Sequence, residues 1–106
     1  MATGFFSADL ASTTNTTLAT VATSLVSVGT INIVNRNASP VRVRVAIAAT
    51  GTPSAGEYIE YDLTLTAAGT AGATYNNSGI VAQAGKNVVV YSDTANVSAA
   101  YWHIEE

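Results

Sequence analysis

The sequence predicts an all-β protein, an antiparallel β-sandwich of about seven to eight strands that is Ig-like or jelly-roll-like. Apolar and polar residues alternate strictly in the segments VRVRVAIA and YIEYDLTL, and such alternation places one set of side chains on a buried face and the other in solvent. Turn-forming Gly, Pro, Asn and Asp recur about every eight to twelve residues, the usual spacing in sandwiches. No segment has a convincing helical period.

Composition places the chain among folded domains with an uncharged surface. The 106 residues are 48% hydrophobic but only 10% charged, against a typical charged share of about 25%. We expect one domain, with residues 17–106 as the sandwich and residues 1–16 as an N-terminal arm or edge strand. A net charge of −3 with four basic residues offers no footprint for nucleic acid or an anionic membrane.

The strands are expected in Thr/Val/Ile-rich runs between turn residues, because these side chains favour pleated structure. In a regular strand, Val26 and Val28 would face the opposite side of the sheet from Ile31 and Ile33. A bulge near Gly29 would place all four side chains on one side. The Val88–Val90 run predicts a strand that is covered on both sides. The predicted segments are Thr17–Thr23, Ser24–Asn35, Val41–Ala48, Glu57–Leu65, Ala73–Asn76, Ile80–Gln83, Asn87–Ser92 and Val97–Ile104.

The segments Val41–Ala48 and Glu57–Leu65 are predicted to form a hairpin, and their charges suggest how its two strands are paired. Pairing opposite charges places Arg44–Glu60 and Arg42–Asp62 on the exposed face, and Val45–Ile59 and Val43–Tyr61 on the core face. The favoured interpretation is control of register, since a slip of one residue would turn both arginines into the core. The alternative is a polar docking surface, to which an aromatic side chain also contributes: Arg42, Arg44, Tyr58, Glu60 and Asp62.

Aromatic residues gather near the two ends of the chain. Tyr101 and Trp102 are adjacent on a strand, so they point to opposite faces and one of them is expected inward. Phe5, Phe6 and Leu10 are the large apolar residues of the N-terminal arm. They are interpreted either as plugs that fill a groove on a neighbouring protein or as caps on the domain's own core.

Residues for catalysis are sparse, so we expect no enzymatic activity, no cofactor and no metal. Without cysteine the chain has no disulfide, thiolate nucleophile or Cys-type zinc site. His103 is the single histidine and has only Glu105 and Glu106 beside it, a poor ligand set. Glu60 and Asp62 alternate on a strand with basic neighbours, as on a solvated face. No apolar run approaches the length of about 20 residues that spans a bilayer, and no signal peptide is apparent.

Several segments together resemble a small β-sandwich module of tailed bacteriophages. They are VNRNASPVRVRVAIA, GEYIEYDLTL, SGIVAQAGKNVVVYSDTANVSA and the terminal IEE. The resemblance covers roughly Ser24 to Glu106 and is closest to virion structural proteins of marine and cyanobacterial phages. In larger proteins of this kind the unit is often one domain of a tail or fibre polypeptide, whereas this chain stands alone with a short N-terminal extension.

The resemblance implies a virion structural protein, made in the host cytoplasm and carried on the particle surface. We expect a knob-like capsid decoration protein that binds the major capsid protein or other virion proteins by non-covalent surface burial, with assembly into a homo-oligomer as an open alternative. The expected attachment residues are Phe5, Phe6 and Leu10, and the polar docking surface defined above is the expected second contact. The alternatives are a tail, baseplate or fibre-tip component that contacts the host, or a carbohydrate-binding module displayed on the virion.

Overall fold

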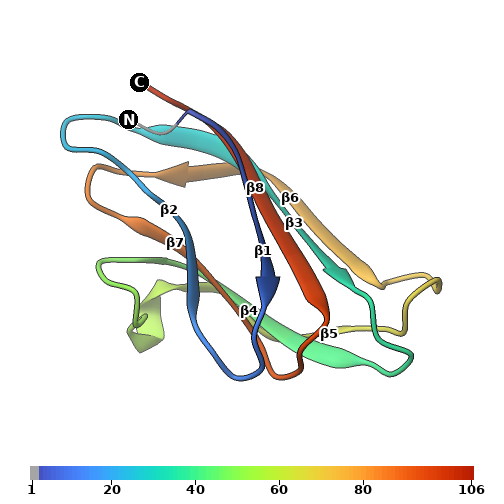
Figure 1. Cartoon of the computed structure of the whole chain (residues 1–106). Coiled ribbons are helices and arrows are strands. Elements are labelled where there is room, and N and C mark those ends of the chain that lie inside the picture. The colour runs from blue at the N-terminus through green and yellow to red at the C-terminus, as the bar shows by residue number, and fades with distance from the viewer. Residues whose placement is uncertain (1–2) are drawn as a thin grey trace.

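The computed structural model describes residues 3–106, which form a sandwich of two four-stranded antiparallel sheets (Figure 1). This confirms the predicted all-β sandwich. One short 3-10 helix, Ala55–Glu57, precedes β5. The strands are β1 Gly4–Leu10, β2 Thr16–Thr20, β3 Ser27–Asn35, β4 Val41–Ala48, β5 Tyr58–Leu65, β6 Thr74–Ala82, β7 Asn87–Ser92 and β8 Val97–Glu105.

The strand order is that of a jelly roll. One sheet, sheet A, has the order β1-β8-β3-β6, and the other, sheet B, has the order β2-β7-β4-β5. Four pairs are nested, β4 with β5, β3 with β6, β2 with β7 and β1 with β8, so the chain is one long hairpin that has been rolled up. The β3–β8 pairing joins two of these nested pairs into sheet A, and the β4–β7 pairing joins the other two into sheet B. Eight strands in this arrangement are typical of jelly-roll domains.

The core lies between the sheets and consists mainly of aliphatic residues. Val88 and Val90 of β7 point into it, while Val89 is buried on the other side of sheet B, so the prediction of a strand covered on both sides is confirmed. Tyr101 is fully buried and Trp102 is 40% exposed, as expected for neighbours on a strand. The largest fully buried side chains of this core between the sheets are Tyr101, Leu10, Ile31, Ile33, Leu65, Val21, Val43, Val45, Val88, Val90 and Val97.

The pairing of β3 with β8 depends on Gly29. The register runs unbroken from Ser27–Glu105 to Asn35–Val97 and sets Gly29 opposite His103. A Cβ atom on Gly29 would lie 2.5 Å from the Cβ of His103 and 2.6 Å from the carbonyl oxygen of Trp102. Only glycine allows the two strands to approach this closely at that point.

The predicted bulge near Gly29 is present, but on the partner strand. The β3–β6 register shifts between Gly29 and Thr30, which leaves Gly79 of β6, with φ of 96°, as the additional residue. The four side chains need not share one side, because Val26 and Val28 point to solvent. The predicted division of this region into two strands, Ala73–Asn76 and Ile80–Gln83, is wrong, since β6 is a single bulged strand.

The predicted β4–β5 hairpin forms, but its predicted register is wrong. The observed partners are Val43–Leu63, Val45–Glu60 and Ala46–Tyr58, with irregularities between them, and Asp62 has a φ of 54°. Two additional residues on β5 therefore change which side chains face inward. Ile59 and Tyr61, expected in the core, are 42% and 59% exposed.

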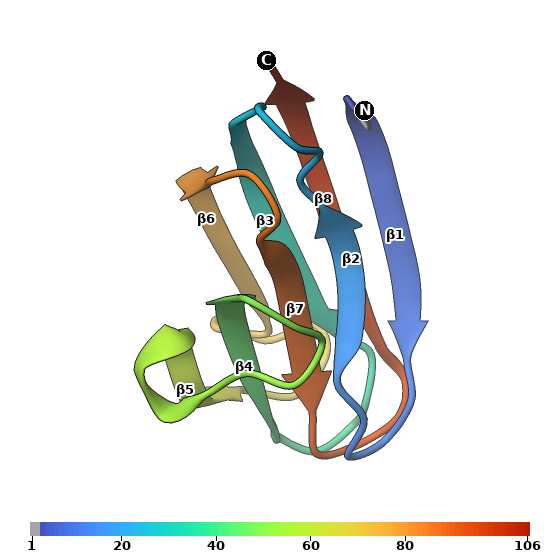
Figure 2. The same cartoon turned by 90° about the vertical axis from the view of Figure 1, so that its left-hand side faces the viewer.

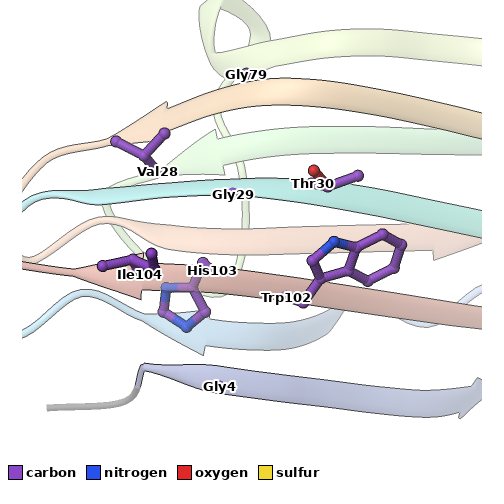
Figure 3. A pocket seen from close by; sticks show the side chains of 8 residues that line it. All are labelled: Gly4, Val28, Gly29, Thr30, Gly79, Trp102, His103 and Ile104. Carbon is purple, nitrogen blue, oxygen red and sulfur yellow. The ribbon is translucent and has the colours of Figure 1, made fainter.

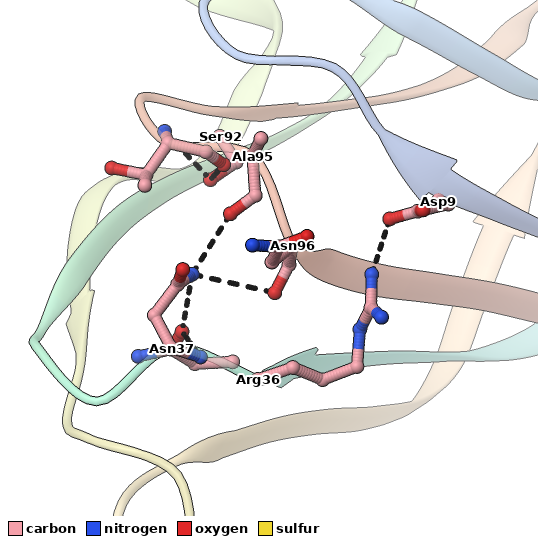
Figure 4. A network of polar contacts seen from close by, with 8 residues as sticks. Asp9, Arg36, Asn37, Ser92, Ala95 and Asn96 are labelled. Carbon is pink, nitrogen blue, oxygen red and sulfur yellow. Dashed lines mark hydrogen bonds and ion pairs between the residues drawn. The ribbon is translucent and has the colours of Figure 1, made fainter.

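Polar contacts tie together the loops at one end of the sandwich (Figure 4). Asn37 in the β3–β4 loop donates to the carbonyl oxygens of Ala95 and Asn96 in the β7–β8 loop at 2.8 and 3.3 Å. Arg36 forms an ion pair with Asp9 at the end of β1. These contacts hold three segments that are distant in sequence and fix the end of the roll.

Gly29→Ala should lower the free energy of unfolding by about 3 kcal/mol, because the added methyl group meets backbone and Cβ atoms that cannot move aside. Chemical denaturation followed by circular dichroism measures this. Gly56→Ala is the control: a Cβ atom there has nothing within 4 Å, so its effect should stay within about 0.5 kcal/mol. Equal stabilities of the two variants would contradict the close approach.

Candidate functional site

Sheet A carries an exposed apolar surface on its outer side, which we call the apolar face. Val28 is paired with Val81 on one side and Ile104 on the other, so these three side chains form a row across β6, β3 and β8. In the adjacent row, the Phe5 and Trp102 rings stack with centroids 6.0 Å apart. The residues of the apolar face and their exposed fractions are Phe5 63%, Val26 40%, Val28 52%, Val81 58%, Trp102 40% and Ile104 58%.

A shallow hollow lies within the apolar face. It measures about 350 Å³ and its floor includes the backbone of Gly29 (Figure 3). Gly4 and Gly79 contribute no side chain, so the surface is depressed between the larger residues around them. The rest of the lining is Val28, Thr30, Trp102, His103 and Ile104.

Sheet B, in contrast, has part of its outer side covered by the chain itself. The loop between β4 and β5 crosses in front of β7 (Figure 2), and a Cβ atom on Gly51 would lie 3.5 Å from the hydroxyl of Thr17 on β2. Beneath this region Ala46, Ala48 and Val89 form a second buried cluster, against which Tyr58 packs.

The carboxylate of Glu57 holds this loop closed. It accepts hydrogen bonds from the backbone N–H of Ser54 at 2.8 Å and of Ala49 at 3.0 Å. These two bonds, the one from Ser54 first, lower the pKa of Glu57 below its ordinary value of 4.5.

Beside the loop, aromatic rings surround an arginine, and we call this group the aromatic–arginine surface. The guanidinium of Arg44 lies 4.3 Å from the centre of the Tyr61 ring and 4.5 Å from that of Tyr91. Its Nε donates to Asp62 at 2.7 Å, and this hydrogen bond raises the pKa of Arg44 above its ordinary value. The Tyr58 and Tyr61 rings are in edge-to-face contact at 4.9 Å, so the surface comprises Arg44, Tyr58, Tyr61, Asp62 and Tyr91.

The structure brings together only part of the predicted polar docking surface. Arg44, Tyr58 and Asp62 belong to the aromatic–arginine surface. Glu60, the predicted partner of Arg44, lies instead opposite Val45. Arg42 is exposed, and its backbone, rather than its guanidinium, is tied by hydrogen bonds with Asp93. Tyr61 and Tyr91 were missed, because Tyr61 was assigned to the core and Tyr91 reaches Arg44 only through the β4–β7 pairing.

The predicted attachment residues of the N-terminal segment lie in three different environments. Gly4–Leu10 forms β1, an edge strand paired with β8 along its whole length. Phe5 is exposed on the apolar face, whereas the half-buried Phe6 ring lies 5.6 Å from that of His103. Leu10 is only 2% exposed and belongs to the core. Phe5 is therefore the one of the three whose side chain is freely accessible.

His103, for which the sequence predicts no metal-binding role, belongs to a buried polar cluster at the end of the core. The hydroxyl of Ser27 lies 2.7 Å from Nδ1 of His103 and 2.7 Å from the hydroxyl of Tyr101. Burial raises the pKa of Tyr101, so its phenol stays neutral. Ser27 and His103 are 0% and 5% exposed, which closes this serine–histidine contact to any substrate. Sequence reasoning missed the contact because it depends on the β3–β8 register.

Within residues 3–106, no group of three or more His, Cys, Asp or Glu side chains is placed to hold a metal ion. The same part of the chain contains no helix with the length and apolar character of a membrane span. The chain matches no protein-family model, and neither a curated protein nor a solved structure was found to be similar to it. The aromatic–arginine surface and the apolar face are the candidate sites, because both present exposed aromatic or apolar side chains of the kind found in macromolecular contacts.

The amide protons of Ala49 and Ser54 should report the titration of Glu57. Because its folded-state pKa is lowered, the carboxylate stabilises the closed loop above its ordinary pKa, and this contribution is lost as the pH falls through the lowered value. In an NMR titration from about pH 7 to about pH 2, both amide resonances should shift together with a midpoint below 4.5. Glu57→Gln is the control and should abolish this shift; a midpoint at or above 4.5 would contradict the geometry.

Proposed function

We propose that this protein is a non-enzymatic structural protein of a bacteriophage virion that decorates the outside of the capsid. The aromatic–arginine surface is the observation that carries the proposal, and we assign it the contact with the shell. Tyrosine and arginine are the residues enriched at the energetic centres of protein interfaces. This surface replaces Phe5, Phe6 and Leu10 as the expected attachment site, since two of those residues are turned inward.

The geometry of the aromatic–arginine surface suits binding at low entropic cost. Arg44 is held between two rings and bonded to Asp62, so its side chain is already ordered before a partner arrives. Tyrosine has few rotatable bonds and offers both an apolar ring and a hydroxyl. Preorganised side chains lose little conformational freedom on association, which leaves more of the contact energy as affinity.

Two further observations support a virion role without deciding it. The jelly-roll arrangement is common in viral capsid domains and in lectins, although one fold serves many functions. The region that resembles phage β-sandwich modules, roughly Ser24 to Glu106, contains β3 to β8, that is, most of both sheets. These two arguments agree on a structural protein of a particle.

A carbohydrate-binding role on the virion is the second candidate, and one feature favours it. A hollow beside the β4–β5 loop is lined by Ala55, Tyr58 and Tyr61, and tyrosine rings can pack against sugars. A glycan array tests this alternative: signal that is lost in Tyr58→Ala would support it, and the absence of signal above background would remove it.

In purified virions, the copy number should be in the hundreds, because a decoration protein repeats with the subunits of the shell. Quantitative mass spectrometry of the particles, with the major capsid protein as internal standard, measures this number. A copy number near a small multiple of three or six would instead indicate a tail, baseplate or fibre-tip component and would contradict decoration.

Tyr61→Ala should weaken binding to capsids that lack the protein by about tenfold or more, as expected for a residue at the centre of an interface. Co-sedimentation of the purified variant with such capsids measures the affinity. Phe5→Ala is the matched control, because Phe5 is also an exposed aromatic, 63% against 59% for Tyr61, but on the opposite sheet. Loss of binding in Phe5→Ala with no loss in Tyr61→Ala would assign attachment to the apolar face instead.

A further inference from the structure

We propose that the apolar face is covered by a second copy of this chain, so that two molecules pack through their A sheets about a two-fold axis. The inference goes beyond the proposed function and does not rest on it, because it concerns the other side of the molecule. It begins from the asymmetry between the two sheets. The chain covers apolar residues on the outer side of sheet B with its own loop, whereas those of sheet A are exposed.

The apolar face is continuous and large for a protein of this size. Val26, Val28 and Ile104 line one hollow together with Glu106 at its edge. Val28, Ile104 and Trp102 line the next hollow, and Trp102 stacks with Phe5. At about 150–250 Å² for a large aromatic side chain and less for valine, the exposed fractions of its six residues amount to roughly 500 Å². Apolar patches of this extent, at the upper end of what monomers expose, usually mark an interaction site.

The charges of sheet A suit contact with a copy of itself. A two-fold axis brings a surface against the same surface, so any net charge would meet its own sign. The charged side chains lie at the two ends of sheet A. Asp9 is near the end of β1, in an ion pair with Arg36, and Glu106 follows β8 and lines the hollow beside Val26 and Ile104. The other outward positions of the strands are Thr, Ser, Asn, Ala and large apolar residues. Between the two ends, a strongly charged partner would find no complementary charge on this face.

The size of sheet A is sufficient for a specific but weak dimer. Four strands about 4.8 Å apart and about nine residues long outline roughly 600 Å². Two such faces together bury about 1,200 Å², the lower limit of stable specific interfaces. Twisted sheets stack about 10 Å apart with interdigitated side chains. The apolar face has both projecting side chains and a recess that can receive them. Val81 and Phe5 project from it, and the hollow beside Gly79 is recessed.

Sedimentation velocity of the purified full chain tests the proposal. Over about 1 to 500 µM, the range in which an interface of this size is expected to form, the mass should rise from one chain to two. Ile104→Lys should weaken the dimer by about tenfold or more, because Ile104 lines both hollows of the face and a lysine there would place an unpaired charge in an apolar contact. Ile59→Lys is the matched control, an exposed isoleucine on sheet B, and should leave the dimer unchanged. Circular dichroism of both variants shows whether they are folded.

A cysteine cross-link provides the second measurement. The chain has no native cysteine, so Thr30→Cys, in the row of Trp102, should form a disulfide-linked dimer on mild oxidation. Thr64→Cys, exposed on β5, should not. A mass of one chain at every concentration, a mass of three or more chains, or equal cross-linking of the two variants would overturn the proposal. None of these results affects capsid binding through Tyr61, so the two proposals fail separately.

Discussion

The pairing of β3 with β8 is the constraint on which the rest of the molecule depends. Without it and the β4–β7 pairing, the chain would be a long hairpin with its tip at the β4–β5 loop, because every nested pair joins strands from the two halves of the sequence. The nine-residue register between β3 and β8 turns that hairpin into a roll. It is possible because Gly29 has no side chain where β8 passes. The same register brings Ser27 to Tyr101 and His103 on the inner side and sets Val28 beside Ile104 on the outer side, so one contact builds both the core and the apolar face.

The two outer sides of the sandwich differ in how far their apolar side chains are buried. Sheet B uses the β4–β5 loop, which Glu57 closes with two hydrogen bonds, to cover Ala46, Ala48 and Val89. Among residues 3–106, no loop covers the exposed side chains of the apolar face on sheet A, and these apolar side chains are larger. Exposed apolar surface of this extent costs free energy in water, and its burial is the main driving force for association. The difference between the sheets is therefore the main support for our proposal that sheet A is covered by a second copy of the chain.

The sequence predicted the strands well and their relative placement less well. Alternation in VRVRVAIA and the valine run of β7 identify buried positions, because the period of a strand does not depend on its partner. The register of β5 could not be obtained in this way. The preference for Arg44–Glu60 assumed a regular hairpin, but the bulged backbone at Asp62 brings that carboxylate to Arg44 and turns Tyr61 outward. The serine–histidine contact and the apolar face were missed for a related reason, since both are products of pairing between strands about 75 residues apart.

The placement of the two candidate surfaces on opposite sheets limits how they can act together. In a dimer built through the A sheets, the two aromatic–arginine surfaces belong to the outer B sheets and face away from each other. Bivalent binding to one flat surface requires both sites to be engaged at once, and it gains nothing where the geometry forbids this. Such a dimer would instead contact two separate partners, one through each B sheet. A protein of this form would connect neighbouring elements of an assembly, and its weak self-association would make the connection dependent on high local concentration, as on a surface that presents many copies.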